Sequence, residues 1–360
     1  MRVRLGDVCD RGTSNLKQSD ITDTSGEYPV YGASGLIGTV SFYHQKLPYV
    51  AVVKDGAGIG RTTLHPAESS VIGTMQYLLP KADILPEYLY YVVKHMHLEK
   101  YYTGATIPHI YFKDYKSEEF NLESLEKQHI IVDMLEKIES VIEARQNELK
   151  RLDDLIKSRF VEMFGDPITN TKGWKIEKAE KHIDLLSGFP FDSSQYTQYG
   201  VKICGGLIIM PQRIDWNSSK YWSSAEDLEE YTLQEKDIVM ALDRPWISEG
   251  FKIAMVDADE LPALLIQRTA RIRAVDINQY YLMHCFALGG FDIHCNVTGS
   301  LVPHISAKDI RSFPIMLPPI ELQKKFAVFV EQIDKSKVAV QKALDEAQLL
   351  FDSLMQKYFQ

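Results

Sequence analysis

The chain lacks the marks of secreted, membrane-spanning and disulfide-stabilised proteins. It has four cysteines in 360 residues, and none of them forms a C-x-x-C pair or another metal-ligand spacing. No run of 18 apolar residues occurs, and the N-terminal stretch has no apolar signal-peptide core. We therefore expect a cytoplasmic protein with reduced cysteines, no metal site and no membrane partner.

Sequence motifs for catalysis are also missing. We find no Walker A motif, helicase signature, N-P-P-[FY] amino-methyltransferase motif or nuclease-like cluster of carboxylates. The one glycine-rich stretch fails as a P-loop, because only three residues separate Gly56 from Gly60 and Arg61 replaces the lysine. We expect no enzymatic activity from this chain. A nucleotide enzyme that uses residues 56–62 is an alternative, and it requires nucleotide binding by the chain alone.

Bulk charge gives only a mild bound on function. The chain carries 49 Asp and Glu against 40 Lys and Arg, a formal net charge of −9, which lowers the expectation of nucleic-acid binding. Phosphate, however, is bound by a local group of Lys and Arg rather than by the charge of a whole chain. The length predicts about two domains, and the hydrophobic and charged fractions are ordinary for a globular protein.

The chain contains an internal repeat. Residues 104–164 and 299–359 align without a gap at a constant offset of 195 (299 minus 104), and both copies begin with the frame G-x-x-x-P-H-I-x-x-K-D. This repetition predicts a pseudo-dimer within one chain. An object with pseudo-two-fold symmetry suits a two-fold partner, of which duplex DNA is the commonest.

Each repeat ends in a long heptad helix, expected over residues 125–164 and 320–359. Apolar residues alternate at spacings of three and four, without Pro or Gly, and about 40 residues make a rod of about 60 Å. Two-fold symmetry requires the rods to run antiparallel, with one globular unit at each end of the pair. Arg145 and Arg159 interrupt the first seam and are expected to fix its register. The pairing residues are Leu135, Ile138, Ile142, Leu149, Leu152, Ile156, Val330, Ile333, Val340, Leu344, Phe351 and Leu354.

The remaining sequence predicts two mixed α/β units. In the first, β-rich runs at 28–40, 48–53 and 70–79 precede a helix that begins at Pro86. In the second, residues 264–272 match 70–78 at an offset of 194, whereas similarity fades further upstream. We therefore assign domains at 1–121 and 165–316, with helical spacers at 122–164 and 317–360. The fold class is α+β with a pseudo-two-fold internal repeat.

Candidate DNA contacts lie in the turns and on one strand of these units. The loop at 55–62 reads either as a plain hairpin turn or as a loop whose glycines let backbone approach a phosphate. The arginines at 268, 271 and 273 alternate on a predicted strand, either as solvated edge charges or as base and phosphate contacts. The full set of candidates is Lys54, Gly58, Arg61, Arg213, Arg244, Trp246, Lys252, Arg268, Arg271 and Arg273.

Histidines recur in the two repeats. His109 and His304 both follow a proline and could suggest catalysis. We interpret them as structural, because each is expected to bond the loop that leads into the last strand before the helix.

The whole chain resembles the specificity (S) subunit of type I restriction-modification systems. The resemblance rests on the repeated G-x-x-x-P-H-I segments, on the helix entry at 317–325, and on the stretches 28–38 and 55–61, which are similar to one class of target recognition domain. Residues 205–208 and 237–242 are similar to another class. The first helix entry, at 122–130, lacks the Pro-Pro pair of the second.

The resemblance implies a role in DNA recognition. Each globular unit would read one half of a split double-stranded DNA target, and the helices would act as spacer and dock for two methyltransferase subunits. Restriction and translocase subunits would complete the complex, and S-adenosylmethionine, ATP and Mg²⁺ would be held by these partners and not by this chain. The alternative is a non-catalytic scaffold that spaces two protein-binding domains. A salt titration separates the two, because DNA affinity falls steeply with salt.

Overall fold

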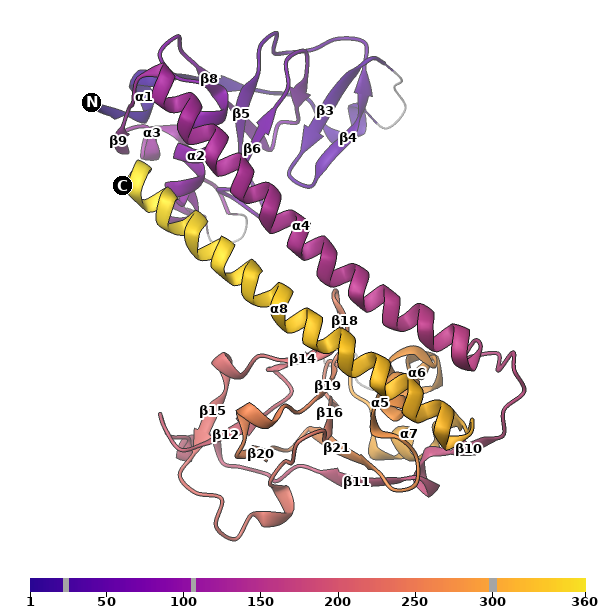
Figure 1. Ribbon diagram of the computed structural model, residues 1–360. Helices are drawn as coiled ribbons and strands as arrows, with labels where there is room; N and C mark the ends of the chain where they lie inside the picture. The colour runs from indigo at the N-terminus through magenta and orange to yellow at the C-terminus, as the bar shows by residue number, and fades with distance from the viewer. Residues whose placement is uncertain (22–25, 105–107, 298–302) are drawn as a thin grey trace. The chain divides into compact units, whose positions relative to one another are not determined.

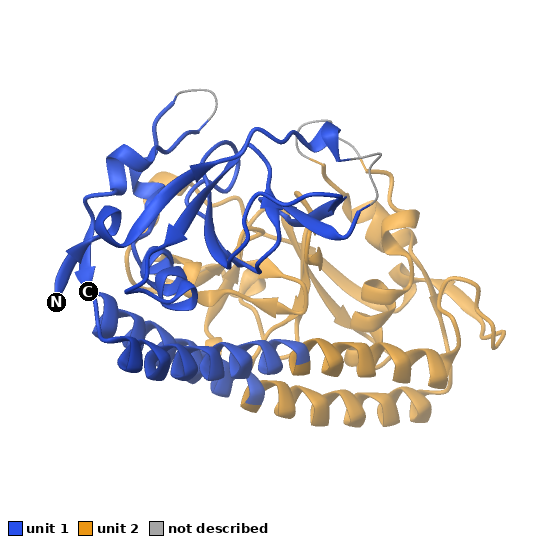
Figure 2. Cartoon of the chain, turned by 90° about the horizontal axis from the view of Figure 1, so that it is seen from above, with its two compact units in different colours: residues 1–147, 340–360 blue, residues 148–339 orange. Residues whose placement is uncertain are grey.

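The chain folds into two compact units that share two long helices. The computed structural model describes residues 1–21, 26–104, 108–297 and 303–360. Unit 1 comprises residues 1–147 and 340–360, and unit 2 comprises residues 148–339 (Figure 2). Helices α4 (Leu125–Phe164) and α8 (Ile320–Phe359) have 40 residues each and contribute one half to each unit. Both predicted helix ranges are confirmed.

Unit 1 is built from three small sheets and short helices (Figure 1). Its strands are β1 (Arg2–Arg4), β2 (Cys9–Thr13), β3 (Tyr28–Gly32), β4 (Gly35–Val40), β5 (Tyr49–Val53), β6 (Thr62–His65), β7 (Ser70–Val71), β8 (Met75–Pro80) and β9 (Glu119–Asn121). Its short helices are α1 (Leu5–Val8), α2 (Pro86–His95) and α3 (Phe112–Tyr115). The strands and the helix that the sequence predicts in this unit are confirmed.

Unit 2 has the same kinds of elements with longer connections. Its strands are β10 (Ile176–Lys178), β11 (Ile183–Ser187), β12 (Val201–Cys204), β13 (Ile209–Met210), β14 (Arg213–Ile214), β15 (Lys220–Trp222), β16 (Ile238–Ala241), β17 (Trp246–Ile247), β18 (Gly250–Phe251), β19 (Ile253–Met255), β20 (Ala263–Leu265), β21 (Thr269–Ala274) and β22 (Pro314–Met316). Its short helices are α5 (Gln279–Leu288), α6 (Phe291–His294) and α7 (Ala307–Ser312).

The two units have the same sheet topology. The four-stranded sheet has the order β2-β8-β5-β6 in unit 1 and β11-β21-β16-β19 in unit 2. A three-stranded sheet follows, β4-β3-β7 and β15-β12-β20, in which one pair is parallel in each unit. A two-stranded ribbon, β1-β9 or β10-β22, is the third sheet that the units share, and unit 2 adds the two-stranded sheets β13-β14 and β17-β18. The repeat therefore extends through the regions where sequence similarity fades.

Each unit packs opposite ends of the two long helices against its α/β core. In unit 1, Ile131 and Leu135 of α4 share one apolar cluster with Phe351 and Met355 of α8. In unit 2, residues near the end of α4 share a cluster with residues near the start of α8, so the helices run antiparallel within each unit. Leu149, Leu152 and Leu344 are half-buried, and Val340 is buried.

A buried glutamine fixes the start of each long helix. Gln128 accepts a hydrogen bond from the Leu85 backbone at 2.9 Å and donates one to the Asp83 carbonyl at 2.8 Å. Gln323 accepts one from the Asn278 backbone at 2.9 Å. The two glutamines are repeat equivalents, and each is almost fully buried. They hold α4 and α8 to the loops that precede α2 and α5.

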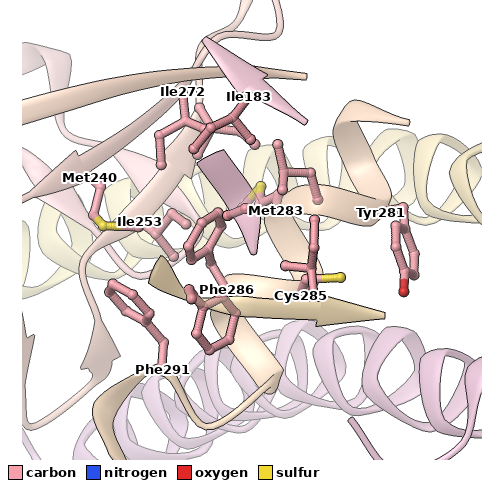
Figure 3. Close-up of a cluster of buried hydrophobic side chains, with 14 of the residues drawn as sticks. Ile183, Met240, Ile253, Ile272, Tyr281, Met283, Cys285, Phe286 and Phe291 are labelled. Atoms are coloured by element: carbon pink, nitrogen blue, oxygen red, sulfur yellow. The ribbon is translucent and has the colours of Figure 1, made fainter. Parts of the chain in front are cut away.

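The core of unit 2 is rich in aromatic side chains. Phe286 and Phe291 pack edge to face at 5.2 Å and close one end of a cluster that includes the sheet residues Ile253 and Ile272 (Figure 3). Phe160 of α4 stacks on Tyr281 of α5 with ring centroids 5.7 Å apart. This cluster joins the sheet, α5 and the two long helices of the unit.

The cysteines and the membrane expectation can be placed on this fold. Cys9, Cys204 and Cys285 are buried free thiols and Cys295 is a half-buried one. Burial raises the pKa of Cys9 to about 12. None of the helices in the described ranges combines the length and hydrophobicity that a membrane span requires.

Candidate nucleic-acid interface

Three loops of unit 1 meet beside the end of β5. The loop between β5 and β6 contacts the segment Pro108–Ile110, where the Gly56 amide donates to the Pro108 carbonyl at 3.0 Å and the Ile110 amide to the Lys54 carbonyl at 3.0 Å. The loop that follows β3 reaches the same place through Arg61, which donates to the Ala33 carbonyl at 2.8 Å. We call this convergence the loop end of unit 1. Residues 105–107, the variable part of the first G-x-x-x-P-H frame, lie outside the described residues.

Asp55 organises this loop end. Its carboxylate accepts from Lys54 Nζ and lies 2.7 Å from His109 Nδ1. Burial raises the pKa of Asp55, but the hydrogen bonds of Lys54 and His109 outweigh it and leave the pKa below its usual value. His109 thus bonds a loop, as the structural interpretation predicts, and the charge of Lys54 is engaged inside the unit.

Gly58 makes room for Arg61. Gly58 has φ +87, and a Cβ at this position would lie 3.3 Å from Arg61 Nη2. The glycine therefore permits both the left-handed backbone and the close approach of the guanidinium. The Arg61 side chain is exposed at the surface of the loop end.

Unit 2 repeats these backbone contacts with other residues. The Arg244 amide donates to the Pro303 carbonyl at 2.7 Å, and the Ile305 amide donates to the Leu242 carbonyl at 2.9 Å. Asp243 forms a backbone bridge with His304, as Asp55 does with His109. Arg244 therefore occupies the position of Gly56. The variable part of the second G-x-x-x-P-H frame, within residues 298–302, lies outside the described residues.

Two exposed arginines of unit 2 have left-handed backbones. Arg244 has φ +44 and Arg268 has φ +64. Arg268 bonds Asp243 Oδ2 at 3.0 Å with 74% of its side chain exposed. Non-glycine residues in this region are strained and gather at functional sites. The sequence placed Arg268 on a strand; this is wrong, because β21 begins at Thr269 and Arg268 turns the chain into it.

A short hairpin adds an aromatic and a third arginine to this side of unit 2. Trp246 of β17 stacks on Phe251 of β18 with ring centroids 5.3 Å apart. Arg213, at the start of β14, is exposed. A hydrogen bond from Ser248 lowers the pKa of Glu249, and the nearby Arg213 lowers it further. Arg213 is therefore close to the tip of the β17–β18 hairpin.

Three other candidate cations of unit 2 point inward. Lys252 is 5% exposed and donates to the Gly206 carbonyl. Arg271 is 6% exposed and donates to Asp184, and Arg273 makes two bonds to Asp237, at 2.5 and 2.8 Å. The two arginines lie on one face of β21, as their spacing predicts, and burial lowers the pKa of Arg271. The structure thus brings Arg213, Arg244 and Arg268 to the surface, leaves Trp246 half-buried against the core of unit 2, and holds the three inward-pointing cations in internal contacts.

A second surface feature is a groove of about 800 Å³ along the helices of unit 1. Ile142, Phe351 and Met355 are its apolar lining, and its charged lining is mixed, with Lys94, His95 and His97 as well as Glu139, Glu143 and Asp352. At the repeat-equivalent place in unit 2, Lys337 pairs with Asp153 and lies 3.8 Å from Asp334 and 3.5 Å from Gln212 Oε1. Unit 1 leaves open a surface that unit 2 fills with its own ion pairs.

Sequence reasoning missed several residues of these sites. The segments that begin at Asp55 and Asp243 correspond in the sequence only as whole regions, and the role of the two aspartates in bridging the Pro-His segment comes from the structure. The carbonyls of Ala33 and Gly206 leave no sequence signal. The signal that was available is the matched pair Gln128 and Gln323, which the repeat displays as an identity. Among the described residues, no group of three or more His, Cys, Asp or Glu could hold a metal ion.

Comparisons with known proteins point to one family. The model of the type I restriction modification DNA specificity domain matches residues 1–152 and 188–347. A specificity subunit of Methanocaldococcus jannaschii, from the type I restriction enzyme MjaVIII, is 25% identical over 307 residues, which are 79% of this chain and 72% of that protein. The specificity subunit of the Escherichia coli enzyme EcoAI is 27% identical over 201 residues, 52% of this chain and 33% of that protein.

Solved structures agree with the fold. The crystal structure of the S subunit of a type I restriction-modification system from M. genitalium has a TM-score of 0.62 at 14% identity, covering 100% of this chain and 96% of that one. A chain from a study of complex assembly in the type I R-M system has a TM-score of 0.50 at 16% identity, covering 99% of this chain and 97% of that one. With two matched α/β units, two matched helices and a family model that spans most of its length, the chain belongs to the family of type I restriction-modification DNA specificity domains.

Proposed function

We propose that the chain is the DNA-binding specificity subunit of a type I restriction-modification complex and that each unit reads one half of a bipartite target. The observation that carries the proposal is the recurrence of one loop end in both units. Each loop end joins the turn after β5 or β16 to the Pro-His segment through the same backbone contacts, and each presents basic side chains of its own. Equivalent frames with different side chains suit two different half-sites.

Exposed side chains at the loop ends are the proposed DNA contacts. In unit 2, Arg213, Arg244 and Arg268 can reach phosphate or a guanine edge, to which arginine donates bidentately. In unit 1, Arg61 is exposed at the equivalent loop end, with its guanidinium bonded to the Ala33 carbonyl. Arg244 combines a left-handed backbone with an exposed side chain. Trp246 adds an aromatic surface beside them.

The proposal assigns the chemistry to partner subunits. Two methyltransferase subunits would bind S-adenosylmethionine and methylate the target, and restriction subunits would supply ATP- and Mg²⁺-dependent steps. This chain would supply specificity and no catalysis. Methyl transfer by the purified chain without partners would contradict this division.

A titration of duplex binding against salt tests the DNA proposal. The chain with its methyltransferase partners is measured on duplexes whose methylated sequence has been mapped in cells. A DNA reader that contacts several phosphates loses affinity steeply as salt rises, with a slope of about −0.9 per contact on logarithmic scales. A scaffold binds no duplex at any salt concentration.

The groove of unit 1 is the proposed dock for a methyltransferase subunit. Its apolar side chains, with the acidic Glu143 and Asp352 on the long helices and the basic Lys94 on α2, suit a partner surface that carries charges of both signs around an apolar centre. The double substitution Glu143→Lys and Asp352→Lys should reduce the number of methyltransferase subunits bound per chain from two to one. Asp133→Lys with Asp345→Lys, on exposed positions of the same helices outside the groove, is the matched control. Equal loss in both double variants would contradict docking at the groove.

A further inference from the structure

Arg61 and Lys252 occupy the same position in the two units. The Arg61 carbonyl accepts from the Val53 amide at 2.9 Å, and the Lys252 carbonyl accepts from the Ala241 amide at 3.0 Å. Val53 and Ala241 end the equivalent strands β5 and β16, and the two cations directly precede β6 and β19. Position in the sheet, and not sequence similarity, makes these two residues equivalent.

The acceptors of the two cations are equivalent as well. The Tyr31 carbonyl accepts from the Ile72 amide at 3.0 Å, and the Cys204 carbonyl accepts from the Ile266 amide at 3.2 Å, which aligns β3 with β12. Two residues further along the chain come Ala33 and Gly206, whose carbonyls accept from Arg61 and Lys252. We call each cation–carbonyl contact a loop latch.

The loop latch is present in both units although the residues and loop lengths around it differ. Its two members are 28 residues apart in unit 1 and 46 residues apart in unit 2, and the donor is Arg in one and Lys in the other. In unit 2 the donor is buried, although burial and the nearby Arg244 lower the pKa of Lys252. A cation used on a backbone carbonyl at such a site restrains the loop that carries the carbonyl.

An exposed leucine lies close in sequence to each latched carbonyl. Leu207 follows the latched Gly206 directly and is 89% exposed. Leu36, the second residue of β4, follows the latched Ala33 by three residues across the β3–β4 turn and is 64% exposed. A leucine held out at a loop end can contact apolar groups of base edges, of which the thymine methyl is the one in the major groove.

We infer that Arg61 and Lys252 are positioning residues, which hold the loop bearing Leu36 or Leu207 against its half of the DNA target. Lys252 acts through the loop and does not touch DNA. The inference rests on the proposed function and extends it, because it names the loop of each unit that carries specificity. It also separates these two cations from Arg213, Arg244 and Arg268, for which direct contact is proposed.

The test measures discrimination by the chain in complex with its methyltransferase partners. Dissociation constants are determined for the cognate duplex and for duplexes with single base-pair changes in either half, over a range of salt. In Lys252→Met, discrimination in the half read by unit 2 should fall about tenfold, within the usual effect of one base-pair contact. Discrimination in the other half and the salt slope should stay unchanged. Lys252→Arg should restore discrimination.

Unit 1 supplies the reciprocal experiment. Arg61→Met should lower discrimination in its own half by about tenfold, and Arg61→Lys, which installs the donor of unit 2, should keep it. A uniform loss of affinity on all duplexes, with the salt slope reduced by about 0.9, would make these residues phosphate contacts and overturn the inference. Unchanged discrimination in both Met variants would overturn it as well.

A substitution at the exposed Leu207 tests the inference without altering a buried residue. Leu207→Ala alters a side chain at the surface and should lower discrimination in the same half as Lys252→Met, and the double variant should lose no more than the larger single effect. Full discrimination in Leu207→Ala would contradict the inference even if Lys252→Met unfolds. Absence of any duplex binding by the unsubstituted complex would instead contradict the proposed function.

Discussion

Unit 1 and unit 2 build one loop end from different side chains. Gly56 and Arg244 fill the same left-handed position, Arg61 and Lys252 fill the same latch position, and Asp55 and Asp243 bridge the same Pro-His segment. The backbone hydrogen bonds are nearly identical, whereas the exposed groups differ. The comparison shows that the frame and the presented chemistry vary independently, as the proposed reading of two different half-sites requires.

The two units also differ in how they hold the long helices. Unit 2 stacks Phe160 on Tyr281 and packs it edge to face against Phe326, whereas unit 1 has Met355 at the position equivalent to Phe160. Methionine adapts to gaps that a ring cannot fill. Unit 1 also leaves a groove at the place that Lys337 and Asp153 occupy in unit 2. The helix interface of unit 1 is therefore the more adaptable one.

The largest expected effect comes from truncating this equivalent pair. Phe160→Ala should destabilise unit 2 by about 3–5 kcal/mol, and Met355→Ala should destabilise unit 1 by about 2–3 kcal/mol, because the site around methionine can collapse. All four tryptophans, at positions 174, 216, 222 and 246, lie in unit 2. Tryptophan fluorescence therefore follows the unfolding of unit 2, and hydrogen exchange follows both units. Equal losses of stability in the two variants would contradict the claim that the helix interface of unit 1 is the more adaptable one.

Acid should weaken both units through buried histidines. Burial lowers the pKa of His65 in unit 1 and of His284 in unit 2 from 6.5 to about 4. The folded state keeps these rings neutral while the unfolded chain protonates them below pH 6.5. Stability is therefore full above pH 6.5 and falls towards pH 4, by at most about 1.4 kcal/mol per pH unit for each histidine.

The two histidines can be separated by substitution. His284 bonds the Tyr280 carbonyl and feels the charges of Lys337 and Asp153, so His284→Leu should flatten the pH dependence of tryptophan fluorescence melting between pH 7 and pH 5. His65→Leu should leave this melting curve unchanged. It should instead flatten the pH dependence of the hydrogen-exchange protection in unit 1. If the stability of both variants still falls with pH as in the unsubstituted chain, groups other than these two histidines cause the pH dependence.

The smallest effect concerns the left-handed turn. Arg244→Gly should stabilise unit 2 by about 1 kcal/mol by relieving strain, while it costs about 1–3 kcal/mol of binding to duplexes that carry the cognate half-site. Gly56→Ala should destabilise unit 1 by about 1 kcal/mol, because the φ of +85 disfavours a side chain although the space around it is open. A variant Arg244→Gly with full binding would remove Arg244 from the proposed contacts.

Sequence patterns could predict the long-range plan of this chain. The three-four spacing without Pro or Gly locates both 40-residue helices, because heptad packing requires apolar side chains at fixed positions in the sequence. The constant offset between the repeats then matches one helix with the other. The repeated Pro-His segment also signals an equivalent structural role, which the contact between His109 and Asp55 shows.

The loop ends could not be predicted to the same depth. A pattern of alternating arginines does not show whether the side chains are solvated or form ion pairs. The acidic partners of Arg271 and Arg273 lie 87 and 36 residues away in the sequence. The left-handed turn at Arg268 depends on how β21 joins its sheet. The latch uses backbone carbonyls, which carry no residue identity at all, so only the structure reveals it.

The central claim is that two equivalent units read two separate half-sites, and mapping of methylated adenines in cells tests it most directly. Cells that carry this chain with its methyltransferase partners are compared with cells that carry the variant Arg244→Ala. The account predicts one motif of two specific halves with a fixed gap, and relaxed sequence preference in only one half for the variant. A continuous motif, or relaxation of both halves together, would contradict the account.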